Sequence, residues 1–162
     1  METLRISPRI FTVWDFAPLF TGPVRVALSD SSIKNLKRSH KRLEKIITSG
    51  KTIYGVNTGF GNLSNIHIGK EDQFTLQVNL VRSHSAGVGT PLELGLVRSA
   101  MVLKLLTYVK GFSGIRLALA EKIVQFLNKD IIPLIPEKGS VGASGDLAPL
   151  SHLGLAIIGE GH

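Results

Sequence analysis

The stretch from Leu92 to Val109 most constrains the fold, because apolar side chains would occupy most sides of a helix drawn through it. Thr90, Pro91 and Glu93 precede it in the pattern of a capping box, with Thr90 as N-cap, the proline in the first turn and Glu93 reaching back. Gly111 supplies a stop signal. A helix that is apolar on most sides has to be buried. The sequence therefore predicts a central helix here, surrounded by other elements.

The rest of the chain is also predicted to be mainly helical, with a few short strands and long loops. Ser29 to Ser32 offer N-caps for a helix that ends near Gly50, and Glu71 with Asp72 opens a second helix. Ser113 is expected to cap another. Prolines make 131–136 extended and the first 22 residues irregular. The expected helices cover 33–49, 71–86, 91–109, 115–128 and 147–158, and a short strand is expected at 24–28.

Composition limits the classes of protein to which this chain can belong. Its 162 residues suit one ordinary domain, and 43% hydrophobic with 19% charged residues is too apolar for compositional disorder. The absence of cysteine excludes disulfides, thiolate metal sites and cysteine nucleophiles. The longest apolar stretch falls short of the ~20 residues that a membrane span needs. We expect a cytoplasmic protein without a membrane partner.

Most of the net charge of +7 lies in one predicted helix. Its only acidic neighbour in this segment is Glu44. The pattern allows a nucleic-acid patch or a solvated helix face beside an acidic neighbour in an oligomer. Aromatic residues do not alternate with the basic ones, so we expect no nucleic-acid partner. The basic residues are Lys34, Lys37, Arg38, Lys41, Arg42 and Lys45.

Glycines gather in two segments, 54–65 and 139–146, where loops are expected to carry function. The second segment lacks the lysine of a phosphate-binding Walker loop. It also departs from the G-x-S-x-G elbow of serine hydrolases, because Asp146 stands at the last position. An ordinary glycine turn remains an alternative.

A third alternative uses the tripeptide Ala143-Ser144-Gly145. The Gly145 nitrogen could attack the Ala143 carbonyl carbon and close a five-membered ring, because glycine allows a strained tight turn. Loss of the Ser144 hydroxyl and of the ring oxygen as two waters would leave a methylidene-imidazolone. Such a group would be an electrophile made from the chain itself, which no ordinary side chain provides.

Two long motifs resemble signatures of the aromatic amino-acid ammonia-lyases. They are residues 139–152 (GSVGASGDLAPLSH) and 54–61 (YGVNTGFG), in the order and at the spacing that the family has. The resemblance extends from about Gly22 to the end of the chain. It is strongest to histidine-specific members, because of the sequence at 57–59 (NTG) and the pair Ser83-His84. Phenylalanine- and tyrosine-specific relatives differ at these positions.

The resemblance implies a reaction, a cofactor and site residues. L-Histidine would lose ammonia without oxidation to give trans-urocanate. Ala143, Ser144 and Gly145 would form the methylidene-imidazolone, with no external cofactor and no metal.

Roles of further residues follow from the same resemblance. Tyr54 would act as the base, and Asp146 would help to orient the ring at the start of the next helix. His84 would recognise the substrate imidazole. Gly61, with Gly59, would keep the loop of the base tight at the substrate. His152 is expected to be structural.

The resemblance also implies that the chain is incomplete. Family members are several times longer, and their helical bundle follows the cofactor motif. The implied fold is the N-terminal, cofactor-bearing part of the aspartase-like helical fold, with an irregular segment 1–22 and an ammonia-lyase domain 23–162. Family members are homotetramers that share residues across subunits, so we expect little or no activity from the isolated chain. Alternatives are a non-catalytic homologue that acts by association, and a lyase or aminomutase for another aromatic amino acid.

Overall fold

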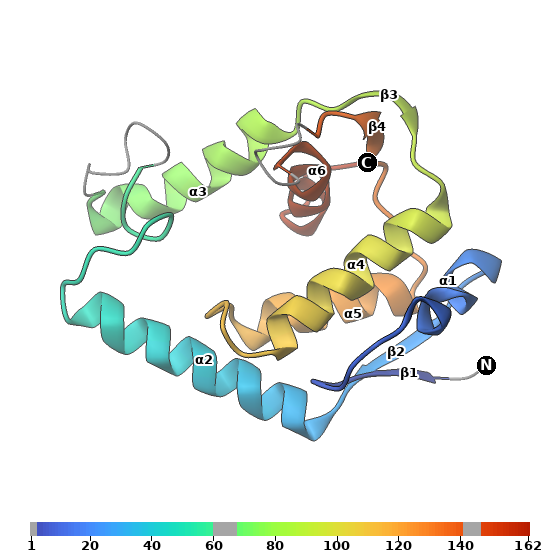
Figure 1. The fold of residues 1–162 in the computed structure, drawn as a ribbon. Coiled ribbons are helices and arrows are strands. Elements are labelled where there is room, and N and C mark those ends of the chain that lie inside the picture. Colours follow the sequence, from blue (N-terminus) through green and yellow to red (C-terminus); the bar gives the residue numbers. More distant parts are fainter. Residues whose placement is uncertain (1–2, 60–67, 141–146) are drawn as a thin grey trace.

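The structure is a computed structural model that describes residues 3–59, 68–140 and 147–162 (Figure 1). Helices predominate, which confirms the predicted mainly-α class. The strands are β1 (Thr3–Ile6), β2 (Arg25–Leu28), β3 (Val88–Pro91) and β4 (Pro136–Lys138). The helices are the 3-10 turn η1 (Val13–Phe16) and the α-helices α1 (Pro18–Thr21), α2 (Asp30–Thr48), α3 (Lys70–His84), α4 (Leu94–Val109), α5 (Leu117–Asn128) and α6 (Leu147–Ile157).

Helix α2 begins where its serines predict. The Ser29 side chain accepts a hydrogen bond from the Ser32 backbone N–H at 3.2 Å, which satisfies one of the free amides of the first turn. The Ser32 hydroxyl donates to the Ile6 carbonyl at 2.9 Å and so attaches the helix to β1. Gly50 follows the helix with a positive φ of 75°. Both ends of this helix are therefore encoded by local chemistry.

The start of α4 differs from the prediction, because Thr90 and Pro91 belong to β3 and not to a capping box. Strand β3 pairs antiparallel with β4, and the Leu92 N–H donates to the Ile135 carbonyl at 2.8 Å. This non-local pairing keeps Thr90 extended. The helix begins three residues later, with Glu93 as an N-cap that makes no side-chain bond.

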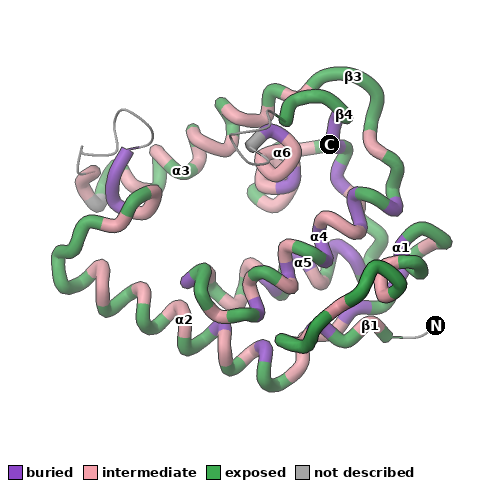
Figure 2. The backbone as a smooth tube through the Cα atoms, viewed as in Figure 1, coloured by how far each residue is buried: buried purple, intermediate pink, exposed green. Residues whose placement is uncertain are grey.

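Helix α4 buries only one of its faces, although it was predicted to be buried all round. Its buried side contributes residues to the hydrophobic core that it forms with α1, α5, β1 and β2 (Figure 2). Leu94, Leu96 and Leu103 are exposed. The core residues that α4 contributes are Val97, Met101, Val102, Leu105 and Val109.

The N-terminal segment is more ordered than its prolines suggest. Thr3–Ile6 forms β1, which pairs in parallel with β2 from Thr3 opposite Arg25 to Ile6 opposite Leu28. Ile6 is fully buried. The prediction of an irregular segment is therefore wrong here. A run of four residues is too short to show alternation, and its partner strand lies about twenty residues away in the sequence.

Helix α3 and helix α6 pack against each other beside the β3–β4 pair (Figure 1). Arg82 near the end of α3 donates through Nε to Glu160 at 2.7 Å. Val81 of α3 lies against Gly154 of α6, where a Cβ would come within 3.3 Å of the valine side chain. This pair of helices connects the two segments in which glycines gather. Within the described part of the chain, no helix is long and apolar enough to cross a membrane.

A buried arginine joins α1, α4 and the end of α5. Arg98 is only 5% exposed; its guanidinium donates to the Asp130 carboxylate at 3.0 Å and to the Leu19 carbonyl at 3.2 Å. Asp130 itself has a φ of 53°, a conformation that Asp and Asn adopt more readily than other side chains do. The charge of Arg98 is thus neutralised inside the fold.

We predict that Asp130→Ala lowers the free energy of unfolding by about 1–3 kcal/mol, because it leaves a buried guanidinium without its carboxylate. Asp130→Asn is the matched control, since the amide oxygen still accepts from Arg98 and asparagine tolerates the positive φ. Chemical denaturation of both variants measures the difference. Equal losses would contradict a specific role for the acceptor.

Candidate functional site

Tyr54 lies on a tight turn between α2 and α3. The turn is closed by hydrogen bonds from the backbone N–H groups of Val56 and Asn57 to the Ile53 carbonyl, at 3.1 and 3.2 Å. Gly55 follows the tyrosine with a φ of 72°, which favours glycine there. The Tyr54 side chain is 64% exposed. The backbone thus presents the ring outward from a fixed turn.

The Asn57 side chain fixes this turn from inside. It is 3% exposed; its Oδ1 accepts from the Ile53 N–H at 2.7 Å and its Nδ2 donates to the Lys51 carbonyl at 2.9 Å. Both bonds span only a few residues, so the side chain ties the segment before Tyr54 to the segment after it. Sequence reasoning used Asn57 only as part of a family motif. Its position after a turn glycine could have indicated this backbone-bonding role.

Thr58 supports the same turn and is fully buried. Its Oγ1 accepts from the Gly55 N–H at 3.2 Å and donates to the Gly59 carbonyl at 2.9 Å. Gly61, predicted at the substrate, lies outside the described residues.

Helix α3 carries both the Tyr54 turn and His84. The Gln77 side chain donates to the Gly55 carbonyl at 3.2 Å, and His84 is the last residue of the helix. Seven residues separate Gln77 from His84, which corresponds to roughly 10 Å of helix rise. The structure thus places His84 on α3 and attaches the turn that carries Tyr54 to the middle of the same helix.

The orientation of the His84 ring is set by its own helix. Nδ1 lies 2.9 Å from the Leu80 carbonyl oxygen and 3.0 Å from the Ser83 hydroxyl oxygen. A carbonyl oxygen only accepts, so Nδ1 carries a proton. In a neutral ring, Nε2 is then the nitrogen with a lone pair. His84 can therefore accept a hydrogen bond at Nε2 from a ligand.

The predicted cofactor residues Ala143, Ser144, Gly145 and Asp146 lie outside the described residues. The structure describes the chain up to Ser140 and again from Leu147, the first residue of α6. Ser140 and Leu147 thus flank the segment that the structure leaves undescribed.

Gly139 brings these ends close to the end of α3. A Cβ at this position would lie 2.9 Å from the Ala148 side chain, closer than real contacts allow, and 3.1 Å from the Gly87 Cα, tighter than most real contacts. Gly87 follows His84 by three residues. The structure thus brings the base of the segment next to the connection that His84 begins.

His152 of α6 also contacts Gly87. Its Nε2 accepts a hydrogen bond from the Gly87 N–H at 3.1 Å. Desolvation lowers the pKa of His152, which favours the neutral ring that can accept. The predicted structural role of His152 agrees with this bond.

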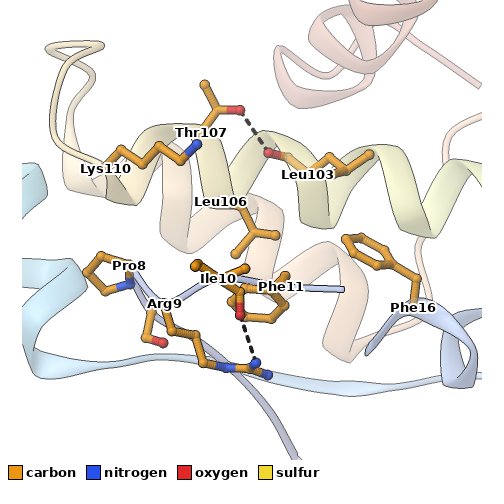
Figure 3. Close-up of a pocket in the computed structure, with 10 residues that line it drawn as sticks. Pro8, Arg9, Ile10, Phe11, Phe16, Leu103, Leu106, Thr107 and Lys110 are labelled. Carbon is orange, nitrogen blue, oxygen red and sulfur yellow. Dashed lines mark hydrogen bonds between the residues drawn. The ribbon is translucent and has the colours of Figure 1, made fainter. Parts of the chain in front are cut away.

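The described part of the chain also contains cavities. A cavity of about 360 Å³ lies between the segment 7–16 and α4 (Figure 3), and one of about 390 Å³ lies between α2 and Gly114. Tyr54 and His84, the predicted site residues that the structure describes, line neither cavity. The described residues contain no group of three or more histidine or acidic side chains that could hold a metal.

The aromatic amino acid lyase family model matches residues 11–162. The match covers most of the chain, so the chain belongs to this family. The family is one of carbon–nitrogen lyases.

The curated relatives that the chain matches include histidine ammonia-lyases. The chain is 51% identical over 158 residues to a probable histidine ammonia-lyase of Thermoplasma acidophilum, which covers 98% of this chain and 32% of that protein. It is 44% identical over 160 residues to histidine ammonia-lyase of Staphylococcus saprophyticus, a match that covers 99% of this chain and 32% of that protein. The chain thus spans about a third of the length of the curated relatives that it matches.

Solved structures have the same fold. Ergothionase from Treponema denticola matches with a TM-score of 0.93 and 31% identity, covering 99% of this chain and 32% of that chain. Histidine ammonia-lyase from Trypanosoma cruzi matches with a TM-score of 0.85 and 34% identity, covering 99% of this chain and 30% of that chain. These matches confirm the predicted ammonia-lyase fold.

We predict that Asn57→Ala loosens the Tyr54 turn, because it removes both hydrogen bonds that the Asn57 side chain makes to Ile53 and Lys51. Hydrogen exchange at the Ile53 amide should become about tenfold faster or more, which corresponds to the loss of about 1.4 kcal/mol locally. Asn57→Asp is the control: a carboxylate oxygen still accepts from Ile53 but cannot donate to Lys51, so exchange should lie between the two. Unchanged exchange in Asn57→Ala would show that the backbone bonds and those of Thr58 close the turn without Asn57.

Proposed function

We propose that this chain contributes part of the active site of an ammonia-lyase that converts L-histidine to trans-urocanate and ammonia. The observation that supports the proposal is the close approach of Gly87, three residues after His84, to Gly139, which opens the glycine segment to which Ser144 belongs in the sequence. Histidine ammonia-lyases among the relatives support histidine as the substrate. Because the chain spans a third of those relatives, the activity is proposed for the full-length polypeptide.

The cofactor is proposed to be a methylidene-imidazolone formed from Ala143, Ser144 and Gly145. Residues 139–147 fit this group in two respects. They provide the required tripeptide with glycine at the position whose nitrogen must approach a carbonyl, and Gly139 and α6 hold both ends of the segment. When formed, the group supplies an electrophile for the substrate. Asp146, immediately before α6, is proposed to help orient it near the positive end of the helix dipole.

His84 is proposed to bind the imidazole of the substrate. Its Nδ1–H bond to the Leu80 carbonyl fixes the tautomer in the neutral ring and leaves Nε2 to accept from an imidazole N–H. This pairing would select an imidazole over a plain phenyl ring, because a phenyl ring has no N–H to donate.

Tyr54 is proposed to remove a proton from the β-carbon of the substrate. The phenol oxygen would have to accept that proton, so the turn must hold the ring at one place relative to the substrate. Asn57 and Thr58 hold that turn, and Gln77 attaches it to α3. Gly61 is proposed to allow the substrate to approach this loop closely.

The full-length protein is proposed to be a cytoplasmic homotetramer in which other subunits complete the site. Association is also the basis of a second candidate function, in which the chain is a non-catalytic homologue. Several large apolar side chains are more than three-quarters exposed and could support association. They are Ile10, Val13, Trp14, Phe74 and Phe112.

The decisive experiment measures mass and product in the same sample. We expect the full-length polypeptide to be lighter than its sequence by two waters and to form urocanate from L-histidine. Ser144→Ala should restore the unmodified mass and reduce kcat by several orders of magnitude, because alanine has no hydroxyl to lose. Wild-type turnover in that variant would refute the self-formed electrophile. The unmodified mass without urocanate in the parent protein would favour the association candidate.

We predict that His84→Leu lowers kcat/KM for L-histidine by about 10- to 100-fold, since one hydrogen bond to the substrate contributes roughly 1–3 kcal/mol. Steady-state urocanate formation measures the change. His84→Gln keeps an amide oxygen as an acceptor and should lose less. The intact mass should stay two waters below the sequence mass in both variants, because neither change affects the tripeptide. Unchanged kcat/KM in His84→Leu would remove this residue from substrate recognition.

A further inference from the structure

Three separate chain segments meet at Gly87. Its N–H donates to His152 of α6, and a Cβ on it would come within 2.9 Å of His152 Nε2 and 3.2 Å of the Pro136 side chain. Its Cα in turn occupies the space beside Gly139. The connection that follows α3, the segment from Pro136 to Gly139 and the middle of α6 are therefore packed together at this glycine.

The hydrogen bond at this point has a defined polarity. Because Gly87 donates, His152 Nε2 must hold a lone pair, and a neutral ring then carries its proton on Nδ1. Burial lowers the pKa of His152 and so favours this form. On the chain segments packed here, Arg82 is paired with Glu160 and Lys138 with Glu137.

We propose that His152 is a positioning residue that joins the connection after His84 to the helix after the cofactor-forming segment, and thereby holds both in register. This inference rests on the proposed function. Its structural basis is the bond from Gly87 to His152, together with the contact between Gly87 and Gly139. His152 acts through the backbone and does not touch the substrate.

The position of α6 relative to Gly87 matters both for the cofactor-forming segment and for His84. Helix α6 begins one residue after Asp146, so any shift of α6 moves the exit of the segment 141–146. Ring closure requires the Gly145 nitrogen to meet the Ala143 carbonyl carbon, which depends on how the ends constrain the chain. His84 lies three residues before Gly87, so the same shift would also move the substrate-binding ring. A displacement of about 1 Å can reduce a rate by about 10²-fold.

The test compares three histidine variants in the full-length polypeptide. His152→Leu removes the acceptor. His152→Gln restores one, since its amide oxygen reaches about as far from the backbone as Nε2 does. His40→Leu is the matched control. His40 lies on α2, and its Nδ1 is also hydrogen-bonded to a glycine backbone group, the Gly114 carbonyl, at 2.9 Å. In Figure 1, α4 and α5 lie between α2 and α6.

Each variant is measured by the fraction of chains that are two waters lighter, by kcat and KM for L-histidine, and by thermal unfolding. We expect His152→Leu to decrease the lighter fraction at least threefold and kcat by about 10- to 100-fold. His152→Gln should stay within threefold of the parent in both. His40→Leu should lower the unfolding temperature to a comparable extent but leave the lighter fraction and kcat unchanged.

Two results would overturn the proposal. Parent-like lighter fraction and kcat in a folded His152→Leu variant would show that the bond does not position the segment. Equal damage in His152→Leu and His152→Gln would show that the acceptor is not what matters. If His152→Leu does not fold, Gly87→Ala replaces it; its Cβ would displace His152, and a parent-like lighter fraction would refute the proposal. Failure of the parent protein to lose two waters would instead refute the proposed function.

Discussion

The contact between Gly87 and Gly139 determines how the proposed site is assembled. Neither position has room for a Cβ, because the backbone of one segment, the side chains of α6 and Pro136 of β4 fill the space. Glycine at both positions allows the end of α3 to lie on the base of the segment that precedes α6. His84 and Ser144 belong to parts of the sequence that are far apart. The approach of the connection after His84 to Gly139 therefore depends on two residues that carry no side chain.

Helix α3 acts as a spacer between the two described parts of the site. The Tyr54 turn is bonded to it at Gln77, and His84 ends it. Since an α-helix has a fixed rise, the Tyr54 turn and the histidine are held at a separation that short side-chain motions change little. Packing of Val81 against Gly154 and the Arg82–Glu160 ion pair then fix α3 to α6. The same helix thus contacts the Tyr54 turn at its middle and carries the proposed substrate-binding histidine at its end.

Local chemistry predicted the elements whose signals are local. The Ser29 cap, the strand at 25–28 and the glycine after α2 are encoded within a few residues, and the structure contains all of them. Thr90 misled the prediction because pairing of β3 with β4 competes with the capping box. Strand β1 was missed for a related reason, as parallel pairing with β2 gives no short-range pattern.

In the candidate site too, the sequence predicts residue types, whereas the contacts that hold them depend on the folded chain. The motifs predicted Tyr54, His84 and the cofactor tripeptide as residue types, but a motif does not state what holds them in place. Asn57, Thr58 and Gln77 hold the Tyr54 turn through bonds that only the folded backbone defines. Tyr54 remains 64% exposed in this structure. A phenol that removes a carbon-bound proton needs a site from which bulk water is excluded. The proposed role of Tyr54 as the base therefore requires that further protein cover this face of the turn, which agrees with the proposal that other subunits complete the site.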